Sequence, residues 1–438
     1  MLSRRALLRL TLAAPLLAAC DVRPPYGIPV PTPTGTNRER VLLWHGDAVL
    51  GERVFARELT PRLQGGGVEV EALAHGDPGE LLRRVQNAAA GGVGPDVWQL
   101  PGEWLPDAVT LKLVQPLPAE LAAWDPAAWT PKLLESASWQ GQGYGVPAAP
   151  RVRQPYYNDE LLRNAGLIDA GRTTPPTTWA EFADVSKRVS APEDRWGSQL
   201  PSTRADELLF RHVVQHAWTA GAELPKREGT RVAFDTPPVR DALQYLLDLV
   251  QRNGAEPLDK PPFRLAETGK VGLWWSETTW LGDMDAIGNT LRVGAAPVPR
   301  KARGGALVQA RHWVLGAYAA QRDAAVAVLG GLAADDLSNR YCAGLSLPPA
   351  RRANWTAPAY TRPTVANGAR VWPAALAQLD AADNAALTGF VGYRATAARM
   401  AGELLLVLTG KKPIQNALVE GEAAVADLMR KIDDGGRP

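Results

Sequence analysis

The chain has 438 residues, of which 46% are hydrophobic and 21% are charged, a balance that fits a globular protein of two or three domains. Its formal charge is +2, and without the three arginines of residues 1–19 the charge of the remainder is −1. A chain so close to neutrality lacks the basic footprint that binding to nucleic acid needs, and we expect no nucleic-acid partner.

The first forty residues have the pattern of an export signal followed by a tether. Three arginines precede an apolar run at residues 10–19 that is short for a bilayer span, and the start also resembles a twin-arginine signal. The run ends in Leu-Ala-Ala-Cys, which resembles a lipoprotein box acylated at Cys20. We predict a signal peptide at 1–19 and a proline-rich tether at 20–40 that anchors an extracytoplasmic protein to the membrane, in the periplasm or at the cell surface. A general export peptide with an incidental cysteine is the alternative.

The folded part begins with alternating strands and helices. Apolar runs at 41–44, 68–73 and 94–98 predict buried strands, and helical patterns over 54–63 and 77–92 separate them. The second helix starts with an aspartate as N-cap and ends at a glycine pair. This β-α-β-α-β order predicts a parallel sheet covered by helices.

The stretch 139–158 organises the rest of the chain. Three glycines stand at alternate positions over 141–145, and three prolines follow over 147–155. Glycine permits a sharp turn, whereas proline fixes φ and removes a hydrogen-bond donor. We therefore predict a tight turn, then an extended piece that cannot join a central sheet, and then the start of a helix at 156–162. Such a piece fits a crossing between two α/β halves.

Further elements follow in order after the crossing. Thr178 and Glu181 form a predicted capping box at a helix start. The other predicted segments are helices at 210–217, 237–250 and 323–334, strands at 271–275, 293–298 and 312–315, an extended break at 345–349, and a helical tail at 395–431 interrupted at 410–413.

A series of short motifs runs through residues 41–431 in a fixed order: Leu-Trp-His-Gly-Asp, Gly-Pro-Asp-Val-Trp, Gly-Tyr-Gly-Val-Pro, Tyr-Tyr-Asn, Pro-Pro-Thr-Thr-Trp, Gly-Lys-Val-Gly-Leu and Leu-Thr-Gly-Lys-Lys. Together with the lipobox and tether, this order resembles the extracellular solute-binding proteins of sugar ABC importers, such as maltose- and glycerol-3-phosphate-binding proteins. The resemblance implies an α/β, two-lobed periplasmic-binding-protein-like (type II) fold with the ligand cleft between the lobes. By this resemblance lobe one is 41–148 plus 309–345 and lobe two is 149–308 plus 346–438, with crossings near 146–151, 304–308 and 344–349.

The resemblance also implies a function. We expect a monomer that binds a sugar or oligosaccharide by hinge closure and delivers it to the permease subunits of an ABC importer, without cofactor and without enzymatic activity. Three alternatives stay open: an anionic polyol phosphate such as glycerol-3-phosphate as the ligand, a receptor that serves sensing instead of transport, and a glycan-acting or metal-binding enzyme.

Candidate ligand-binding residues follow from the chemistry of a sugar. Its apolar C–H faces suit indole rings, and its hydroxyls suit carboxylates and arginines. The chain has 15 tryptophans, and those near strand ends interest us most, with core packing as the alternative for each. The loop positions of the resembling family imply Asp47, Glu103, Trp104 and Trp280, while Asp96 is expected to anchor backbone. The full predicted set is Trp44, Asp47, Glu103, Trp104, Arg151, Trp275, Glu277, Trp280 and Arg311.

The arginines are a departure from the resembling family. Where maltose-type members have a carboxylate in the crossing, this chain has Arg151, with Arg153 two residues on and Arg311 near the second crossing. Guanidinium groups bind carboxylates or phosphates in a bidentate fork. Either the ligand is anionic, as His45 in the first motif slightly favours, or these arginines pair with acids across the hinge.

The sequence gives only a weak signal for an enzyme or a metal site. His212 and His216 stand four residues apart on a predicted helix, a spacing that can hold zinc, but Val213 stands where a metalloprotease has glutamate. We expect a partly exposed helix face there and no metal. Cys342 has no disulfide partner once Cys20 is acylated, and we expect it to be a small buried side chain.

Overall fold

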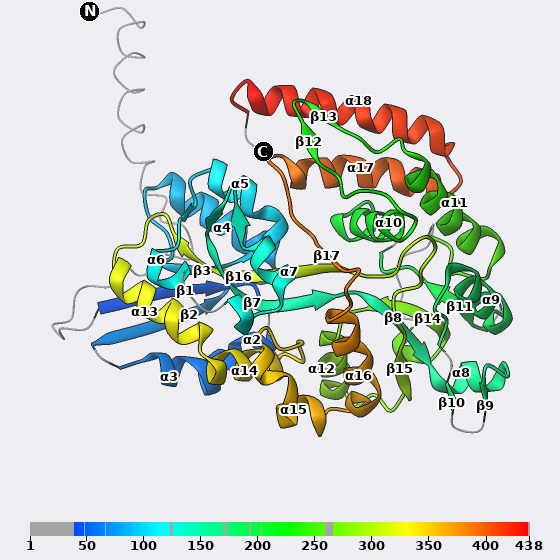
Figure 1. Cartoon of the computed structure of the whole chain (residues 1–438), viewed down its shortest axis with the longest axis horizontal. Helices are drawn as coiled ribbons and strands as arrows, with labels where there is room; N and C mark the ends of the chain where they lie inside the picture. Colours follow the sequence, from blue (N-terminus) through cyan, green and yellow to red (C-terminus); the bar gives the residue numbers. More distant parts are fainter. Residues whose placement is uncertain are drawn as a thin grey trace, which may run out of the picture. The chain divides into compact units, whose positions relative to one another are not determined.

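The computed structural model describes residues 39–436, except Ala48, Gly66, Thr203 and residues 123–125, 170–171, 174, 192–193 and 259–265. The predicted signal peptide, the lipidation site Cys20 and nearly all of the tether lie outside the described residues. Within them the chain forms two main β-sheets, each with helices packed against it, and several short two-stranded ribbons (Figure 1). No helix of this described part combines the length and the hydropathy needed to cross a bilayer.

The first sheet has seven strands, with the core order β17-β16-β3-β1-β2 and with β4 and β7 also paired to β16. The strands are β1 (Glu39–His45), β2 (Val68–Ala74), β3 (Val97–Pro101), β4 (Val114–Gln115), β7 (Gly145–Val152), β16 (Leu307–Gly316) and β17 (Ala385–Ala386). Strand β1 runs parallel to both β2 and β3, which confirms the predicted parallel β-α-β-α-β unit. Val41 and Leu43, which lie on the same face of β1, are fully buried.

Helices pack on this sheet, and side-chain caps fix where they start. The helical segments of this part are α2 (Val49–Val54), the π-helix η1 (Phe55–Leu59), α3 (Thr60–Leu63), α4 (Pro78–Ala90), η2 (Gly102–Trp104), α5 (Leu105–Thr110), α7 (Pro131–Ser136), α13 (Arg322–Ala333) and α14 (Asp335–Gly344). The Asp77 carboxylate accepts the Glu80 N–H at 2.9 Å, as predicted for the start of α4. Asp96 accepts the backbone N–H groups of Leu42 and Ala320, both at 2.8 Å, so its expected anchoring role is confirmed.

The second sheet has four strands in the order β11-β14-β8-β15. They are β11 (Trp196–Gln199), β14 (Val271–Ser276), β8 (Gln154–Asn158) and β15 (Val293–Ala295). The helices of this part of the chain are α8 (Asp159–Asn164), α9 (Trp179–Val189), α10 (Glu207–Thr219), α11 (Pro237–Arg252), α12 (Thr279–Ala286), α15 (Pro358–Thr361) and α16 (Gly368–Leu379). The capping box of Thr178 and Glu181 is present at the start of α9, and Asn158 caps α8, where the sequence predicts a helix start.

The glycine- and proline-rich crossing differs from its prediction. It was expected not to join a central sheet, but β7 pairs with β16, and β8 lies between β14 and β15. Among the residues that the structure describes, β7 pairs on one side alone, so Pro147 and Pro150 need not donate to a second neighbour. In β8 the single Pro155 is the second residue, beyond the end of the ladder with β15, which starts at Tyr156. The prediction was wrong because prolines at edge and end positions leave the ladder intact.

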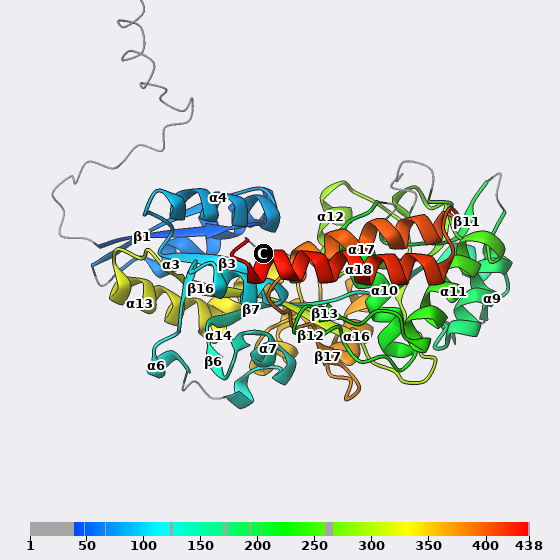
Figure 2. The same cartoon turned by 90° about the horizontal axis from the view of Figure 1, so that it is seen from above.

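The chain changes sheets at Arg153, between β7 and β8, and changes back between β15 and β16. The lobe boundaries predicted from the sequence stay a prediction. Helices α17 (Tyr393–Leu408) and α18 (Ile414–Asp433) pack against each other, and α17 packs on α10; both views show the pair side by side (Figures 1 and 2). The tail helix is thus broken near Gly410 as predicted.

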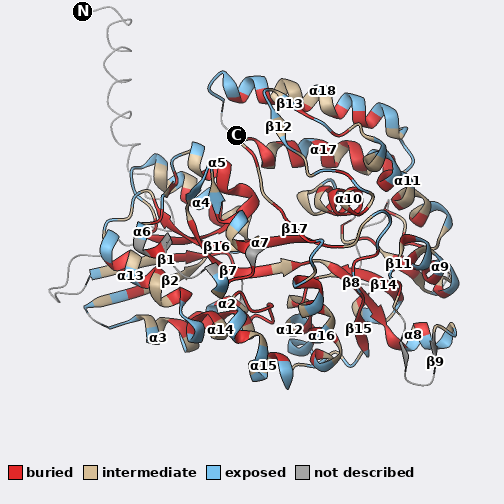
Figure 3. Cartoon of the chain, viewed as in Figure 1, coloured by how far each residue is buried: buried red, intermediate tan, exposed pale blue. Residues whose placement is uncertain are grey.

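Buried residues are concentrated in the strands of both sheets and on the helix faces turned toward them (Figure 3). Cys342 is one of them. It makes no disulfide, its Sγ donates to the carbonyl oxygen of Ala148 at 3.3 Å, and burial raises the pKa of the thiol to about 12. It is therefore the small buried side chain that was expected.

Candidate functional site

Charged side chains from both sheets meet at the crossings. Four acids and four arginines form what we call the charged cluster: Asp47, Glu103, Glu207, Glu277, Arg151, Arg153, Arg211 and Arg311. The acids Asp47 and Glu103 follow the parallel strands β1 and β3, and Glu277 follows β14, so strand ends of the two sheets supply them. Buried charges are stable only when they are paired and hydrogen-bonded, and this arrangement provides both.

Asp47 has the most partners in the cluster. Its carboxylate accepts hydrogen bonds from Arg311 at 2.5 Å, from the Tyr341 hydroxyl at 2.6 Å and from Gln99 Nε2 at 3.0 Å. Burial alone would raise the pKa of Asp47, but Arg311 and Tyr341 outweigh it and hold that pKa below its ordinary value. Asp47 is therefore a fixed negative charge at the end of β1.

Glu277 receives both crossing arginines. Arg151 Nη1 donates to its Oε2 at 2.8 Å, and Arg153 Nη2 donates to its Oε1 at 2.6 Å. Burial opposes ionisation, but the two guanidinium groups prevail and lower the pKa of Glu277 to about 2. The three arginines therefore pair with acids, as one of the two open alternatives has it, while pairing across a hinge stays a prediction.

Helix α10 brings a third group into the cluster. Arg211 Nη1 donates to Glu103 Oε1 at 2.7 Å and to Gln309 Oε1 at 2.6 Å. One turn earlier, Glu207 accepts the indole N–H of Trp104 at 3.1 Å. These contacts join the loop after β3 to a helix that accompanies the second sheet.

The predicted tryptophans have different surroundings. Trp104 and Trp275 adjoin the charged cluster, Trp104 through Glu207 and Trp275 through its carbonyl, which accepts from Arg153 at 3.5 Å. The ring of Trp275 packs on His212 at 4.9 Å. Trp44 instead packs edge-on against His75. The Trp280 ring packs against Tyr156 and Trp274, and its backbone N–H donates to the carbonyl oxygen of Glu277 at 3.1 Å. Two further tryptophans, Trp98 in β3 and Trp313 within β16, are buried in the core.

Several buried polar atoms of the cluster have no hydrogen-bond partner among the described residues. They include Glu103 Oε2 and the Nε atoms of Arg151, Arg153 and Arg211. A cavity of about 10 Å³, room for one water, lies beside them between Arg153, Arg211 and Trp275. The junction therefore carries unused hydrogen-bonding capacity, and this cavity is too small for a sugar.

The histidine pair of α10 is more buried than the sequence predicted. His212 and His216 are both buried, with ring centroids 4.4 Å apart, so the expected partly exposed face is wrong. Trp275 of β14, Trp179 of α9 and Tyr245 of α11 pack against this face. Burial lowers the pKa of His216 to about 4 and that of His212 well below its ordinary value, and both rings are neutral at pH 7.

Sequence reasoning missed part of the cluster. Glu207 and Arg211 were not among the candidates, although their opposite charges at i, i+4 spacing on a predicted helix were a usable signal. Tyr341 and Gln99 carry no such signal, because only the fold brings them to Asp47.

Comparison with known proteins now adds the family. A family model described as bacterial extracellular solute-binding protein matches residues 62–364. A curated protein of Brucella abortus, named as a binding protein, is 22% identical over 225 residues, which are 50% of this chain and 53% of that protein. The chain thus spans about half the length of the curated relatives it matches.

Solved structures show the fold. The sugar-binding protein MalE of Xanthomonas citri is 21% identical with a TM-score of 0.75, covering 90% of this chain and 98% of that one. A solute-binding protein of Thermotoga lettingae, bound with α-D-tagatose, is 18% identical with a TM-score of 0.75, covering 89% and 100%. Maltose-bound MalE3 of T. maritima is 18% identical with a TM-score of 0.74, covering 89% and 99%. These likenesses confirm the predicted periplasmic-binding-protein-like fold. The family model covers well over half of the chain, so the protein belongs, as its motifs indicated, to the bacterial extracellular solute-binding proteins, a family of binding proteins and not of enzymes.

Proposed function

We propose that this protein binds a neutral sugar or oligosaccharide at the charged cluster and delivers it to the permease subunits of an ABC importer. The observation that supports this most is the meeting of acids and guanidinium groups from both sheets beside the rings of Trp104 and Trp275. Hydroxyl groups suit such a set of donors and acceptors, and indole faces suit the C–H surface of a sugar ring. Two of the similar structures are described with maltose and with α-D-tagatose.

The pairing of the arginines favours a neutral ligand over an anionic one. Arg151, Arg153 and Arg311 each bond a carboxylate at 2.8 Å or less. A phosphate would have to displace one of these carboxylates and leave it buried without a partner, which is costly. A hydroxyl needs no displacement, because it can use the unpartnered Nε and Oε2 atoms. The polyol-phosphate alternative is therefore second.

Binding requires the two halves of the site to separate. The cavity beside Arg153 holds about 10 Å³, far below the roughly 300 Å³ at which small-molecule pockets begin. We propose that the predicted lobes open about the crossings near residues 146–151, 304–308 and 344–349 and close over the ligand. The ligand then replaces part of the direct bonding between Glu103 and Arg211.

The proposal also includes anchoring of the protein to the membrane and its role in transport. Acylation at Cys20 would hold the protein at the membrane surface beside a permease, and the proline-rich segment that follows would give it reach. The monomer is the unit that acts. Adjacent genes for two permease subunits would favour transport over sensing as its role.

The test is titration of the intrinsic tryptophan fluorescence with maltose, α-D-tagatose, glycerol-3-phosphate and glucose-6-phosphate. We expect saturable change with a neutral sugar, and a loss of about tenfold or more in affinity in Arg153→Met, because a buried charged partner is removed. Arg83→Met, which changes an exposed ion pair with Glu80, is the matched control and should bind as the wild type does.

Two outcomes would overturn the proposal. Saturation with the phosphates alone would move the assignment to the anionic ligand, and identical affinities in Arg153→Met and the wild type would remove the charged cluster from the site. Release of monosaccharide from oligosaccharides by the purified protein would contradict a pure binding role.

A further inference from the structure

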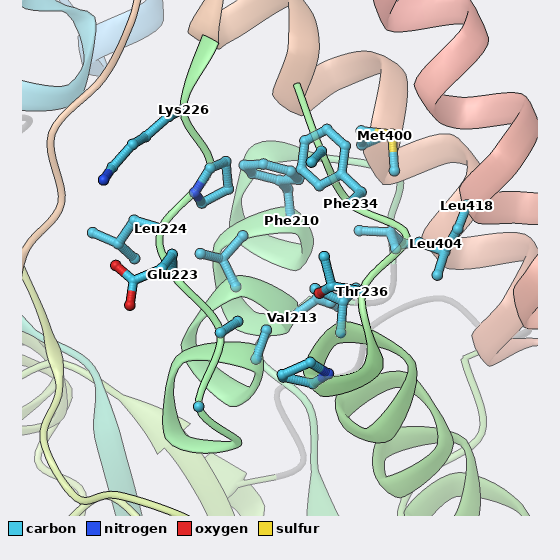
Figure 4. Close-up of a pocket in the computed structure, with 18 of the residues that line it drawn as sticks. Phe210, Val213, Glu223, Leu224, Lys226, Phe234, Thr236, Met400, Leu404 and Leu418 are labelled. Atoms are coloured by element: carbon cyan, nitrogen blue, oxygen red, sulfur yellow. The ribbon is translucent and has the colours of Figure 1, made fainter. Parts of the chain in front are cut away.

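A second pocket lies behind α10, on the side away from the charged cluster. Its volume is about 390 Å³, and its wall is made by α10, the segment 221–239, α17 and α18. Figure 4 shows Phe210, Phe234 and Leu404 among the lining side chains. No residue of the charged cluster lines it. The pocket is therefore separate from the proposed sugar site.

The two faces of α10 explain why an apolar pocket exists there. Glu207, Arg211 and Gln215 follow each other at i, i+4 spacing, and the first two point into the charged cluster. Phe210, together with the valines and the alanine at positions 213, 214 and 217, lies on the neighbouring face and lines the pocket. The segment 221–239, which includes the ribbon β12 (Arg227–Glu228) and β13 (Arg231–Val232), passes over this face without filling the space below it.

The rim of the pocket carries balanced charge. Glu223, Lys226, Glu228 and Arg231 line it, are exposed, and form no ion pair with any described residue. Two acids and two bases give the rim no net charge, so it does not select a charged molecule. The wall is apolar, with a phenylalanine pair, Phe210 and Phe234, at 5.8 Å between ring centroids.

We propose that this pocket binds an uncharged, largely apolar small molecule, separately from the sugar site. The size supports this class: a cavity of about 150 Å³ lined by apolar side chains takes up benzene, so 390 Å³ accommodates a molecule of two to three rings. Volumes of roughly 300 to 1,000 Å³ with apolar walls are those of small-molecule sites. The apolar body lies against Phe210 and Leu404, and a polar end reaches the rim at Lys226 or Glu223.

The test uses N-phenyl-1-naphthylamine, an uncharged aromatic dye that fluoresces when it leaves water, with the full-length protein. We expect saturable binding of one dye per chain. Leu224→Glu places a carboxylate at the half-buried edge of the pocket. It should lower the affinity for the dye by about tenfold or more, because an apolar ligand would bury an unpaired charge. Val419→Glu, on the exposed side of α18, is the matched control and should leave the affinity unchanged.

A second variant keeps the test decisive if Leu224→Glu fails to fold. Val214→Phe fills the pocket with an apolar ring and should also abolish the dye signal while circular dichroism and melting remain those of a folded protein. Absence of saturable binding, or equal affinity in both pocket variants and the wild type, would overturn the proposal. A loss of dye in Arg153→Met with retention in Leu224→Glu would place the dye at the charged cluster. Dye affinity that falls as protein concentration rises, with a dimer in sedimentation, would mean that a second copy covers the pocket.

Discussion

Two buried carboxylates of the charged cluster, Glu277 and Glu103, have pKa values shifted in opposite directions. Burial favours the neutral acid at both. At Glu277 the guanidinium groups of Arg153 and Arg151 overcome burial and lower the pKa to about 2. At Glu103 burial prevails over the single partner Arg211, the neighbouring Glu207 adds to the rise, and the pKa reaches about 7.

The comparison shows that the number of cationic partners, and not the degree of burial, decides the charge of each acid. Glu277 uses both oxygens for arginines, whereas Glu103 Oε2 has no partner among the described residues. An ionised carboxylate only accepts hydrogen bonds, but a carboxyl with a pKa near 7 can also donate one. Glu103 can therefore act as donor or acceptor toward a hydroxyl group of the proposed ligand, while Glu277 holds the crossing arginines in place.

The largest loss of stability is expected from a substitution of Glu277, the acid that pairs with two arginines. Glu277→Gln leaves two buried guanidinium groups with a neutral partner, and loss of a buried ion-pair partner costs about 3–5 kcal/mol. We expect a loss of this size in the free energy of unfolding, measured by urea denaturation at pH 7.5. Glu80→Gln, whose partners Arg83 and Arg84 are exposed, is the control and should leave the midpoint unchanged. Equal midpoints for Glu277→Gln and the wild type would contradict the pairing described here.

The next effect concerns the dependence of stability on pH. Below pH 4.5 the Glu103 carboxyl is protonated in both states. Between pH 4.5 and 7 the unfolded chain loses this proton while the folded chain keeps it, so the wild type loses stability as pH rises. Relative to Glu103→Gln, which does not titrate, the wild type should lose about 3 kcal/mol across this window and nothing further above it.

The difference between two proteins is the quantity to measure, because other groups also titrate. All five histidines have pKa values lowered by burial, so absolute stability falls as pH drops from about 6.5 toward 4, the opposite sign. Their contribution cancels in the difference. The difference in unfolding free energy between the wild type and Glu277→Gln should not change between pH 5 and 8. If the difference for Glu103→Gln were also independent of pH, the contrast between the two acids would be wrong.

The smallest expected effect tests the bond between the two halves of the site. Trp104→Phe removes the indole N–H that Glu207 accepts, at a cost of about 1 kcal/mol. A double-mutant cycle with Glu207→Gln isolates this coupling from other effects of each substitution. Additive losses in the cycle would show that the contact contributes nothing.

Much of the fold could be predicted from local signals. Asp77, Asn158 and Thr178 are at helix starts because side-chain oxygens satisfy the first backbone N–H groups, and that chemistry is visible in three or four residues. The prolines of β7 were misjudged because a strand's position within a sheet depends on partners far along the chain. No local sequence pattern near Pro150 indicates that β7 will pair with β16 on one side alone in the described part of the chain.

The site was only partly predictable for the same reason. Asp47 and Glu103 follow buried strands, so their convergence could be expected from a parallel sheet. Tyr341 lies 294 residues from its partner Asp47, and Gln309 lies 98 residues from its partner Arg211, so the sequence contains no local trace of either contact. The bonding of Arg151 and Arg153 to one acid could be offered from the sequence only as one of two alternatives.

Helix α10 also reaches the crossing itself. Gln215 accepts the backbone N–H of Leu307 at 2.7 Å and donates to the carbonyl of Gly305 at 3.3 Å. One helix thus contacts the proposed sugar site, the proposed apolar site and the predicted crossing near 304–308. Thermodynamic linkage then applies to the two proposed sites. If a sugar at the charged cluster changes the affinity of the apolar pocket for the dye, the dye changes the affinity for the sugar by the same factor, so dye binding reports on the sugar site.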